Sequence, residues 1–153
     1  MTGLTNDYLE KLTKRLMKKR KFVGVFAANE VLNVNERHPF SIIFNTGRVG
    51  TPGLHFVAVF VTRTSVYYFD SFGEETIQQD ISKFIKKLNK PCVMLCQAIQ
   101  HRKSNFCGFY ALAFLIWMSV KKKKPQSFYS LFSYSDLREN DNIVTRFILN
   151  EIK

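Results

Sequence analysis

The chain contains 153 residues, of which 46% are hydrophobic, and these include fifteen phenylalanines. This composition excludes general disorder and allows a buried core, and the length favours one domain over residues 1–153. The longest uncharged run, residues 105–120, is shorter than the roughly 20 apolar residues that span a bilayer, and the N-terminus lacks the apolar stretch of a secretory signal. With an odd number of cysteines, these features predict a soluble, intracellular protein, neither secreted nor transmembrane.

The positive charge of the chain indicates the kind of partner that it binds. The formal net charge is +11, and the basic residues cluster in the segments Lys11–Lys21, Lys83–Lys90, His101–Lys103 and Lys121–Lys124. Such an excess indicates a polyanionic partner, for which nucleic acid is the best candidate. Because the sequence contains no motif for reading bases, we expect sequence-independent binding that weakens steeply with salt. A charged surface that only keeps the protein soluble is the alternative interpretation.

The first half of the chain predicts one helix and then strands. An amphipathic helix is capped by Thr5, and its apolar stripe consists of Tyr8, Leu9, Leu12 and Leu16. A buried strand is expected over Phe40–Phe44, followed by a Gly-rich loop over Asn45–Gly53. The segments Leu54–Val61 and Ser65–Phe69 have the composition of strands, and the short connection between them favours an antiparallel hairpin.

The second half adds helices and one further strand. Apolar residues at helical spacing predict a helix over Glu74–Leu88, and Cys92–Ile99 has the composition of a strand. The uncharged run Asn105–Val120 predicts a buried helix, and Asp141–Ile152 predicts an amphipathic helix that closes the chain. Together these elements predict an α+β fold, with a mixed, antiparallel-rich sheet packed against helices.

Cys107 is the candidate nucleophile. It stands where a turn meets the buried helix, and the unpaired N–H groups and positive dipole at a helix N-terminus favour thiolate over thiol. The thiolate is the reactive form of cysteine. A cysteine nucleophile also needs a base and a group that orients the base.

His55 and Asp70 are the candidates for those roles. The predicted hairpin places His55 where its first strand begins and Asp70 where its second strand ends, so an antiparallel pairing brings both to the same end of the sheet. Asp70 can then accept a hydrogen bond from one imidazole nitrogen while the other faces Cys107. Gln100 lies seven residues before Cys107 and is the candidate oxyanion donor.

Each of these residues also has an ordinary explanation. A cysteine at a helix start is commonly a small buried hydrophobe, and Asp70 and Gln100 could be turn and surface residues. Their joint order and spacing favours a cysteine protease. Cys92, Cys96 and His101 lack the paired spacing of a structural zinc site, so no metal is expected. No phosphate-binding loop is present, which argues against ATP hydrolysis.

These residues resemble the adenovirus maturation protease (adenain) family, cysteine endopeptidases related in fold to the SUMO-deconjugating proteases. The loop Asn45–Arg48 and the segment Gly53–Phe56 resemble the family's approach to its catalytic histidine. The segment Tyr68–Gly73 resembles its acidic block. Gln100 and the pair Cys107–Gly108 resemble its glutamine and nucleophile at the same separation.

The resemblance implies a role for each residue. Cys107 would be the nucleophile, His55 the base and Asp70 its orienting acid. Gln100 would donate its side-chain amide to the oxyanion, beside the backbone N–H of Cys107. The family cleaves viral capsid and core precursors at small, usually Gly-containing, sites during virion maturation.

The resemblance further implies stimulation by DNA and by a short basic viral peptide, no metal or small-molecule cofactor, and a location in the host nucleus and the virion. Nothing in the sequence indicates an obligate dimer, so a monomer is expected.

The sequence departs from the family at several positions. Phe56 stands where the family has Trp, and Asp70 where adenovirus enzymes often have Glu, and the C-terminal region is shorter. Some members bind their peptide through a disulfide near the position of Cys92, but the spacing from Cys92 to Gln100 is shorter here. Two alternatives remain open: removal of ubiquitin-like modifiers by the same catalytic residues, and a non-catalytic, basic DNA-binding core protein that keeps the fold.

Overall fold

A five-stranded mixed sheet forms the centre of the molecule, with its strands side by side in chain order. The structure is a computed structural model that describes residues 5–18, 20–30, 34, 36–47 and 55–153. The strands are β1 (Phe22–Ala27), β2 (Phe40–Asn45), β3 (Phe56–Val61), β4 (Val66–Phe69) and β5 (Cys92–Leu95). The outer pairs β1–β2 and β4–β5 are parallel, and the inner pairs β2–β3 and β3–β4 are antiparallel.

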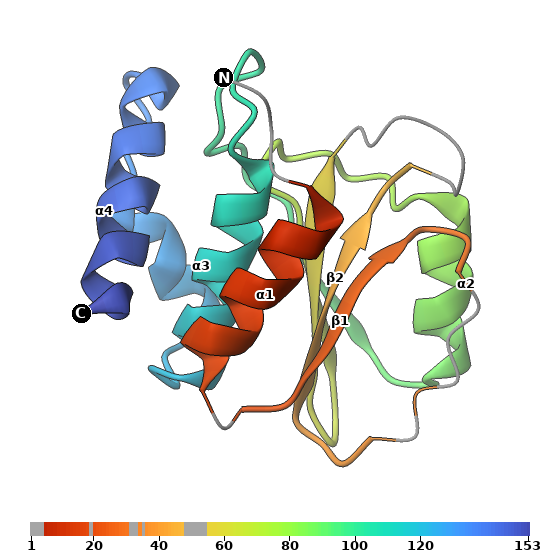
Figure 1. Cartoon of the computed structure of the whole chain (residues 1–153). Helices are drawn as coiled ribbons and strands as arrows, with labels where there is room; N and C mark the ends of the chain where they lie inside the picture. The colour runs from red at the N-terminus through yellow and green to blue at the C-terminus, as the bar shows by residue number, and fades with distance from the viewer. Residues whose placement is uncertain (1–4, 19, 31–33, 35, 48–54) are drawn as a thin grey trace.

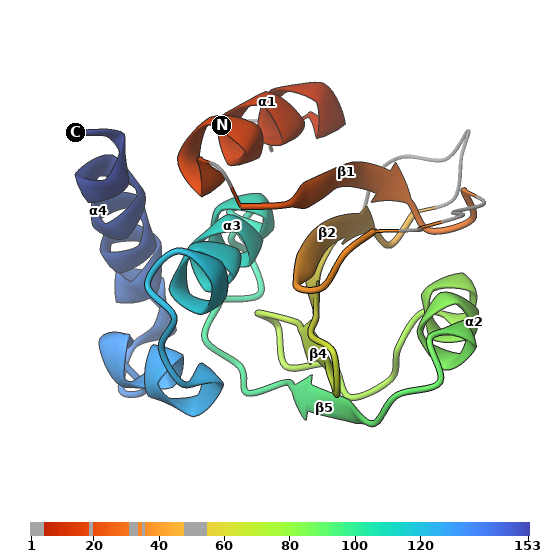
Figure 2. The same ribbon diagram turned by 90° about the horizontal axis from the view of Figure 1, so that it is seen from below.

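Helices cover both faces of this sheet. The α-helices are α1 (Asn6–Met17), α2 (Gln79–Lys87), α3 (Cys107–Ser119) and α4 (Asn140–Ile152), and two 3-10 helices, η1 (Pro125–Leu131) and η2 (Leu137–Glu139), lie between α3 and α4. Seen along the sheet edge, α1 and α3 pack on one face with α4 outside α3, and α2 lies alone on the other face (Figures 1 and 2). The α+β class and the mixed sheet predicted from the sequence are confirmed.

The directions of the strands determine at which of the two ends of the sheet each connecting segment lies. The strands β1, β2, β4 and β5 start at the end where β3 stops, because Phe40 pairs with Val61 and Val66 pairs with both Val61 and Cys92. At the opposite end β3 starts and β4 stops, so residues that precede β3 and follow β4 lie close together. The hydrogen bond between Ser119 and Ser41, 3.3 Å long, shows that α3 ends beside the start of β2.

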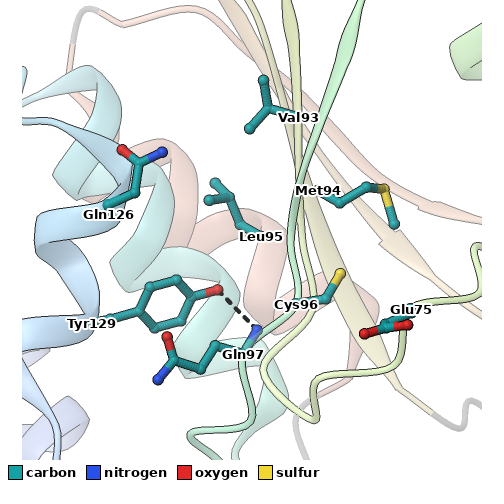
Figure 3. Close-up of a pocket in the computed structure, with 8 residues that line it drawn as sticks. All are labelled: Glu75, Val93, Met94, Leu95, Cys96, Gln97, Gln126 and Tyr129. Atoms are coloured by element: carbon teal, nitrogen blue, oxygen red, sulfur yellow. Dashed lines mark hydrogen bonds between the residues drawn. The ribbon is translucent and has the colours of Figure 1, made fainter.

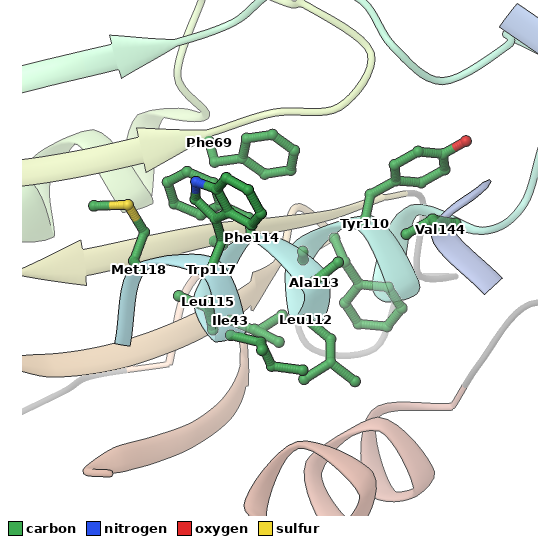
Figure 4. Packing of buried hydrophobic residues seen from close by; sticks show 14 of the residues in the cluster. Ile43, Phe69, Tyr110, Leu112, Ala113, Phe114, Leu115, Trp117, Met118 and Val144 are labelled. Atoms are coloured by element: carbon green, nitrogen blue, oxygen red, sulfur yellow. The ribbon is translucent and has the colours of Figure 1, made fainter. Parts of the chain in front are cut away.

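The helix α3 runs through the middle of the larger core. All of its residues except Phe109 are buried, as its lack of charged residues predicts. The rings of Phe69 in β4 and Phe114 in α3 stack with their centroids 4.6 Å apart and 4° between their planes (Figure 4). Phe128 of η1 meets both rings edge-on. A second cluster under α2, which includes Ile81 and Ile85, fills the other face of the sheet.

Several elements differ from the sequence-based expectation. Tyr8 is 56% exposed, so it does not belong to the buried stripe of α1, although Thr5 caps this helix as expected, through a 3.1 Å bond from the Tyr8 N–H. The helix predicted from Glu74 begins at Gln79, because the side chain of Gln78 accepts from the N–H groups of Asp80 and Ile81 and starts the helix there.

The strand predicted over Cys92–Ile99 stops at Leu95, because the chain then turns so that the N–H groups of Ile99 and Gln100 bond to the carbonyl of Ser71. The strand β1 was not predicted; Gly24, at φ 152°, sits at a register shift within it that interrupts a simple strand pattern. Within the loop predicted over Asn45–Gly53, residues 48–53 lie outside the described residues, as does Leu54. No helix among the described residues is both long enough and apolar enough to cross a membrane.

Replacing Phe114 with alanine tests the central role of the α3 core. We expect Phe114→Ala to lower the free energy of unfolding by about 3–5 kcal/mol, because it removes a fully buried ring and leaves a cavity. Leu149→Ala, at a side chain that is 53% exposed, is the control and should change it by less than about 0.5 kcal/mol. Urea unfolding followed by circular dichroism measures both, and equal effects would contradict the assignment.

Candidate active site

The hairpin β3–β4 brings His55 and Asp70 into contact. His55 directly precedes β3 and Asp70 directly follows β4, and the pairing of Ala58 with Phe69 sets both at the same end of the sheet. The Nε2 atom of His55 lies 2.7 Å from Oδ1 of Asp70, and the two side chains are only 10% and 4% exposed. A short hydrogen bond shielded from water in this way is strong, and it fixes the orientation of the imidazole ring.

The turn after β4 holds the carboxylate of Asp70 in place. Oδ1 of Asp70 also accepts the backbone N–H of Phe72 at 2.8 Å, and the Gly73 N–H closes the turn on the Asp70 carbonyl at 3.1 Å. Gly73 has φ +79°, and a Cβ atom there would lie 2.8 Å from the backbone nitrogen of Ala98. Asp70 therefore begins a turn and holds His55 at the same time, so these two interpretations of the residue do not exclude each other.

The ring of Phe72 covers one face of the His55 imidazole. The two rings stack with centroids 4.5 Å apart and 27° between the planes. The guanidinium of Arg102 lies over the same phenyl ring at 5.3 Å and pairs with Glu74 at 2.6 Å. These contacts limit rotation of the imidazole, which must stay in one orientation to serve as a base.

Cys107 is the first residue of α3 and is 8% exposed. The preceding residue, Phe106, offers no side-chain cap to the helix, so the first N–H groups of α3 and its dipole are available to a negative charge near Cys107. The thiol of Cys107 lies close enough to His55 to interact with its ring. The structure therefore brings His55, Asp70 and Cys107 together at one end of the sheet.

The surroundings of His55 favour its protonated form. Burial lowers the pKa of the imidazole, but the hydrogen bond to Asp70, the interaction with Cys107 and the negative charges of both partners outweigh it, and the pKa rises from 6.5 to about 9. The Nδ1 atom, on the ring edge away from Asp70, is buried and has no fully formed hydrogen bond, alone among the buried side-chain nitrogen and oxygen atoms of the described residues. This nitrogen is free to exchange a proton with a neighbouring sulfur.

Gln100 lies beside this group but does not bond to it. Its side chain is 1% exposed; Oε1 accepts from the hydroxyl of Ser71 at 2.6 Å, and Nε2 donates to the carbonyl and the hydroxyl of Ser104, each at 3.1 Å. Both partners belong to the turns that lead to Phe72 and to Cys107. The role of Gln100 as an oxyanion donor stays a prediction, since among the described residues both contacts of Nε2 are to Ser104 and none is to His55, Asp70 or Cys107.

A separate hollow of about 740 Å³ lies between β5 and η1 (Figure 3). Its lining includes Cys96 and Tyr129, whose hydroxyl accepts the Gln97 N–H at 3.2 Å. Burial, followed by the charge of Asp70, raises the pKa of the Cys96 thiol to about 12, and burial also raises that of Cys92. These thiols stay protonated at neutral pH, so neither is a good second nucleophile. No group of three or more potential metal ligands is found among the described residues.

Comparison with known proteins supports the fold. No family model and no curated protein matches the chain. Among solved structures, the crystal structure of the ASFV pS273R protease is similar, with a TM-score of 0.60, 19% identity and coverage of 95% of this chain. The Se-Met crystal structure of the same protease gives a TM-score of 0.60 and 20% identity. This chain covers 66% of that protease, just under two thirds of its length.

The chain thus shares the fold of this protease. The narrower resemblance to the adenain family remains a prediction. At 19–20% identity the match speaks for the fold alone, and the assignment of chemistry to this chain depends on its own residues.

Sequence reasoning missed most of the residues that support the site. Phe72 and Ser71 were seen only as part of a turn or motif, and Ser104 and Asp141 were not singled out. A residue that acts by contacting another side chain across the fold gives no local signal. The run Asp70–Gly73 did carry a local signal, because a Gly three residues after a candidate acid indicates a tight turn.

The raised pKa of His55 can be tested by substitution of its partners. Asp70→Asn should lower it more than Cys107→Ala, because the hydrogen bond to Asp70 is the larger of the two stabilising interactions. NMR titration of the imidazole resonances measures the pKa in each protein. His38, exposed and distant from the site, is the internal control, and its curve should coincide in all three. A larger shift in Cys107→Ala than in Asp70→Asn would contradict this ranking.

Protein stability should follow the same titration. Because the pKa of His55 is raised in the folded state, its contribution to the free energy of unfolding is fully present below about pH 6.5 and is lost as the pH rises through about 9. The stability advantage of the wild type over His55→Gln should therefore shrink between these values. An advantage that grows with pH would show that the imidazole is neutral in the fold.

Proposed function

We propose that this protein is a cysteine peptidase that cleaves internal peptide bonds. The observation that carries the proposal is the buried 2.7 Å contact between His55 and Asp70, in an imidazole that also interacts with Cys107 at the start of α3. A thiolate stabilised by an imidazolium and a helix N-terminus is an activated nucleophile. The SUMO-protease-like fold agrees with this chemistry.

The proposed reaction has two stages. The Cys107 thiolate attacks the carbonyl carbon of the substrate, and the negative charge moves to the carbonyl oxygen, where the Cys107 backbone N–H and the Gln100 amide stabilise it. His55 gives its Nδ1 proton to the leaving amine, and a thioester remains on Cys107. His55 then takes a proton from water, which hydrolyses the thioester and restores the thiolate. Asp70 keeps the imidazole in place throughout.

The substrates we propose are viral capsid and core precursors, cut at Gly-containing sites during virion maturation, in the host nucleus and the virion. Support comes from the resemblance in the blocks around His55, Asp70 and Cys107 and from the fold shared with a viral protease. Removal of ubiquitin-like modifiers would use the same residues on a C-terminal Gly-Gly tail, and substrate assays separate the two activities. We further propose that the protein acts as a monomer and that a short basic viral peptide stimulates it.

Nucleic acid is the proposed second partner and activator. Basic side chains converge on the end of the sheet opposite His55, because the segments that precede β1, β2 and β5, the β3–β4 turn and the end of α3 meet there. The exposed ones are Lys18, Arg20, Lys21, Arg37, Arg63, Lys86, Lys87, Lys121, Lys122, Lys123 and Lys124. Acidic partners there include Glu36, which pairs with Lys21, and Glu151, which pairs with Lys121. The remaining charge supports contact with a phosphate backbone.

Labelling of the nucleophile tests the peptidase assignment. A thiol-directed peptide probe ending in Gly-Gly should modify Cys107 selectively, and mass-spectrometric mapping reports the site. Labelling should fall by at least about tenfold in His55→Ala, because the thiolate loses its counter-ion, and should vanish in Cys107→Ala with folding unchanged. Equal, slow labelling of Cys92, Cys96 and Cys107, with and without DNA, would remove the support for a peptidase and favour a non-catalytic DNA-binding protein.

Charge reversal tests the nucleic-acid surface. The triple substitution Arg63→Glu, Lys122→Glu and Lys124→Glu should weaken binding to a DNA duplex by at least about tenfold at low salt and flatten the dependence of affinity on salt. The triple substitution Lys11→Glu, Lys14→Glu and Lys103→Glu makes the same change in net charge at exposed sites elsewhere and should weaken binding less. Fluorescence anisotropy measures both, and DNA stimulation of cleavage should fade between roughly 50 and 200 mM salt. Equal losses would mean that only net charge matters.

A further inference from the structure

A chain of buried and part-buried hydrogen bonds fixes which end of the Gln100 amide faces Ser71 and which end faces Ser104. The Oε1 atom accepts from the Ser71 hydroxyl at 2.6 Å, and Nε2 donates to both oxygen atoms of Ser104. Ser71 is fully buried, and Gln100 is 1% exposed. Water is thus a poor substitute for these partners, and an amide turned the wrong way round would leave buried polar groups without hydrogen bonds, which is unfavourable.

Asp141, in the first turn of α4, fixes the direction of the Ser104 hydroxyl in this chain of hydrogen bonds. Its Oδ1 atom accepts the hydroxyl of Ser104 at 2.8 Å and the hydroxyl of Tyr110 at 2.8 Å. An ionised carboxylate can only accept hydrogen bonds, so the single hydroxyl hydrogen of Ser104 is committed to Asp141. The Ser104 oxygen must then act as an acceptor, and it accepts from Nε2 of Gln100 and from the N–H of Phe106 at 3.2 Å.

The direction matters because the two ends of an amide have opposite polarity. A Gln side chain that is rotated by half a turn occupies almost the same space but exchanges its oxygen for its nitrogen. An oxyanion is stabilised by N–H and repelled by C=O. The Ser104 carbonyl, which can only accept, and the carboxylate of Asp141, two hydrogen bonds removed from the amide, therefore both select the orientation that keeps the nitrogen of Gln100 toward the turn leading to Cys107.

We propose that Ser71, Ser104 and Asp141 are positioning residues for Gln100: one N–H of its amide is shared between the two oxygens of Ser104, and the other is left to donate to the oxyanion. The Ser104 carbonyl and Asp141 together set the direction of the hydrogen bonds. This inference rests on the proposed peptidase function. It also gives α4 a role at the active site, since α4 reaches the site through Asp141 and through Asn140, whose Nδ2 donates to the carbonyl of Ile99 at 2.7 Å. None of the three residues need touch the substrate.

Steady-state kinetics on a fluorogenic peptide test this role. Ser104→Ala and Asp141→Ala should each lower kcat by about tenfold with little change in KM, a smaller loss than the roughly 10²–10³ expected for Gln100→Ala. Asp141→Asn keeps an acceptor oxygen and should recover part of the loss. The matched controls are Ser130→Ala, an exposed hydroxyl that bonds within η1, and Asp7→Ala, an acid in the first turn of α1, and both should leave kcat unchanged.

Two further readouts separate positioning from general damage. Alkylation of Cys107 by iodoacetamide needs no oxyanion site, so its rate should stay within about twofold of the wild type in Ser104→Ala and Asp141→Ala. In a Gln100→Ala background, Ser104→Ala should have no further effect on kcat, because the group that it positions is gone. A parallel fall in alkylation and kcat, or additive losses in the double variant, would overturn the proposal. A rise in kcat for Ser104→Ala would mean that Ser104 competes with the oxyanion.

The NMR signals of the Gln100 side-chain amide give a test that does not depend on activity. With ¹⁵N-glutamine labelling and assignment by Gln100→Ala, the two amide protons should be protected from exchange in the wild type and should shift and lose protection in Asp141→Ala, but not in Asp7→Ala. Unchanged signals in Asp141→Ala would overturn the positioning role. Absence of Cys107 labelling and of peptide cleavage in the wild type would instead refute the proposed function, and the amide signals would still decide the direction of the chain.

Discussion

The antiparallel register of β3 and β4 is the constraint on which the rest of the site depends. It sets His55 and Asp70 at the same end of the sheet, and their 2.7 Å contact is shielded from water. A shift of the register by one residue would turn every side chain of the strand to the other face, and both faces here are packed. Helix burial on the two sides thus protects the alignment of His55 and Asp70, although neither α1 nor α2 contributes a residue to this pair.

Cys107, the candidate nucleophile, is positioned by the core rather than by a loop. Because α3 is apolar on all sides and buried against β3, its N-terminal residue has little freedom to move relative to the hairpin, and Phe69 at the end of β4 stacks directly on Phe114 of α3. The geometry between Cys107 and the His55–Asp70 pair therefore follows from the packing of aromatic rings. Sites supported by helices and strands in this way hold their geometry more closely than sites on loops.

The sequence allowed prediction of the residues whose position depends on local order. His55 and Asp70 could be paired because a short turn joins their strands, and Cys107 because an uncharged run starts beside it. Ser104 and Asp141 could not be found, since they are 37 residues apart and meet only after α4 has packed. The exposure of Tyr8 has the same cause. Helical spacing predicts an apolar stripe on α1, but how much of that stripe is buried depends on the packing of β1 and α3. The start of α2 at Gln79 depended on a cap by Gln78, a residue type outside the usual capping set.

Strand direction also explains why the proposed basic surface lies at the opposite end of the sheet from His55. Arg102 is the exception, since it lies over the Phe72 ring that stacks on His55, where it pairs with Glu74. Cationic side chains are costly near a buried imidazolium, because like charges would lower the pKa of His55 and weaken the thiolate pair. The segments that lead into β1, β2 and β5 and the end of α3 carry their lysines and arginines away from Cys107, so the net charge of +11 need not disturb the site. A polyanion on the proposed basic surface would therefore leave the catalytic end open to a peptide. Any stimulation by DNA would then have to act either by bringing enzyme and substrate onto the same strand or through α3, the element that connects the two ends.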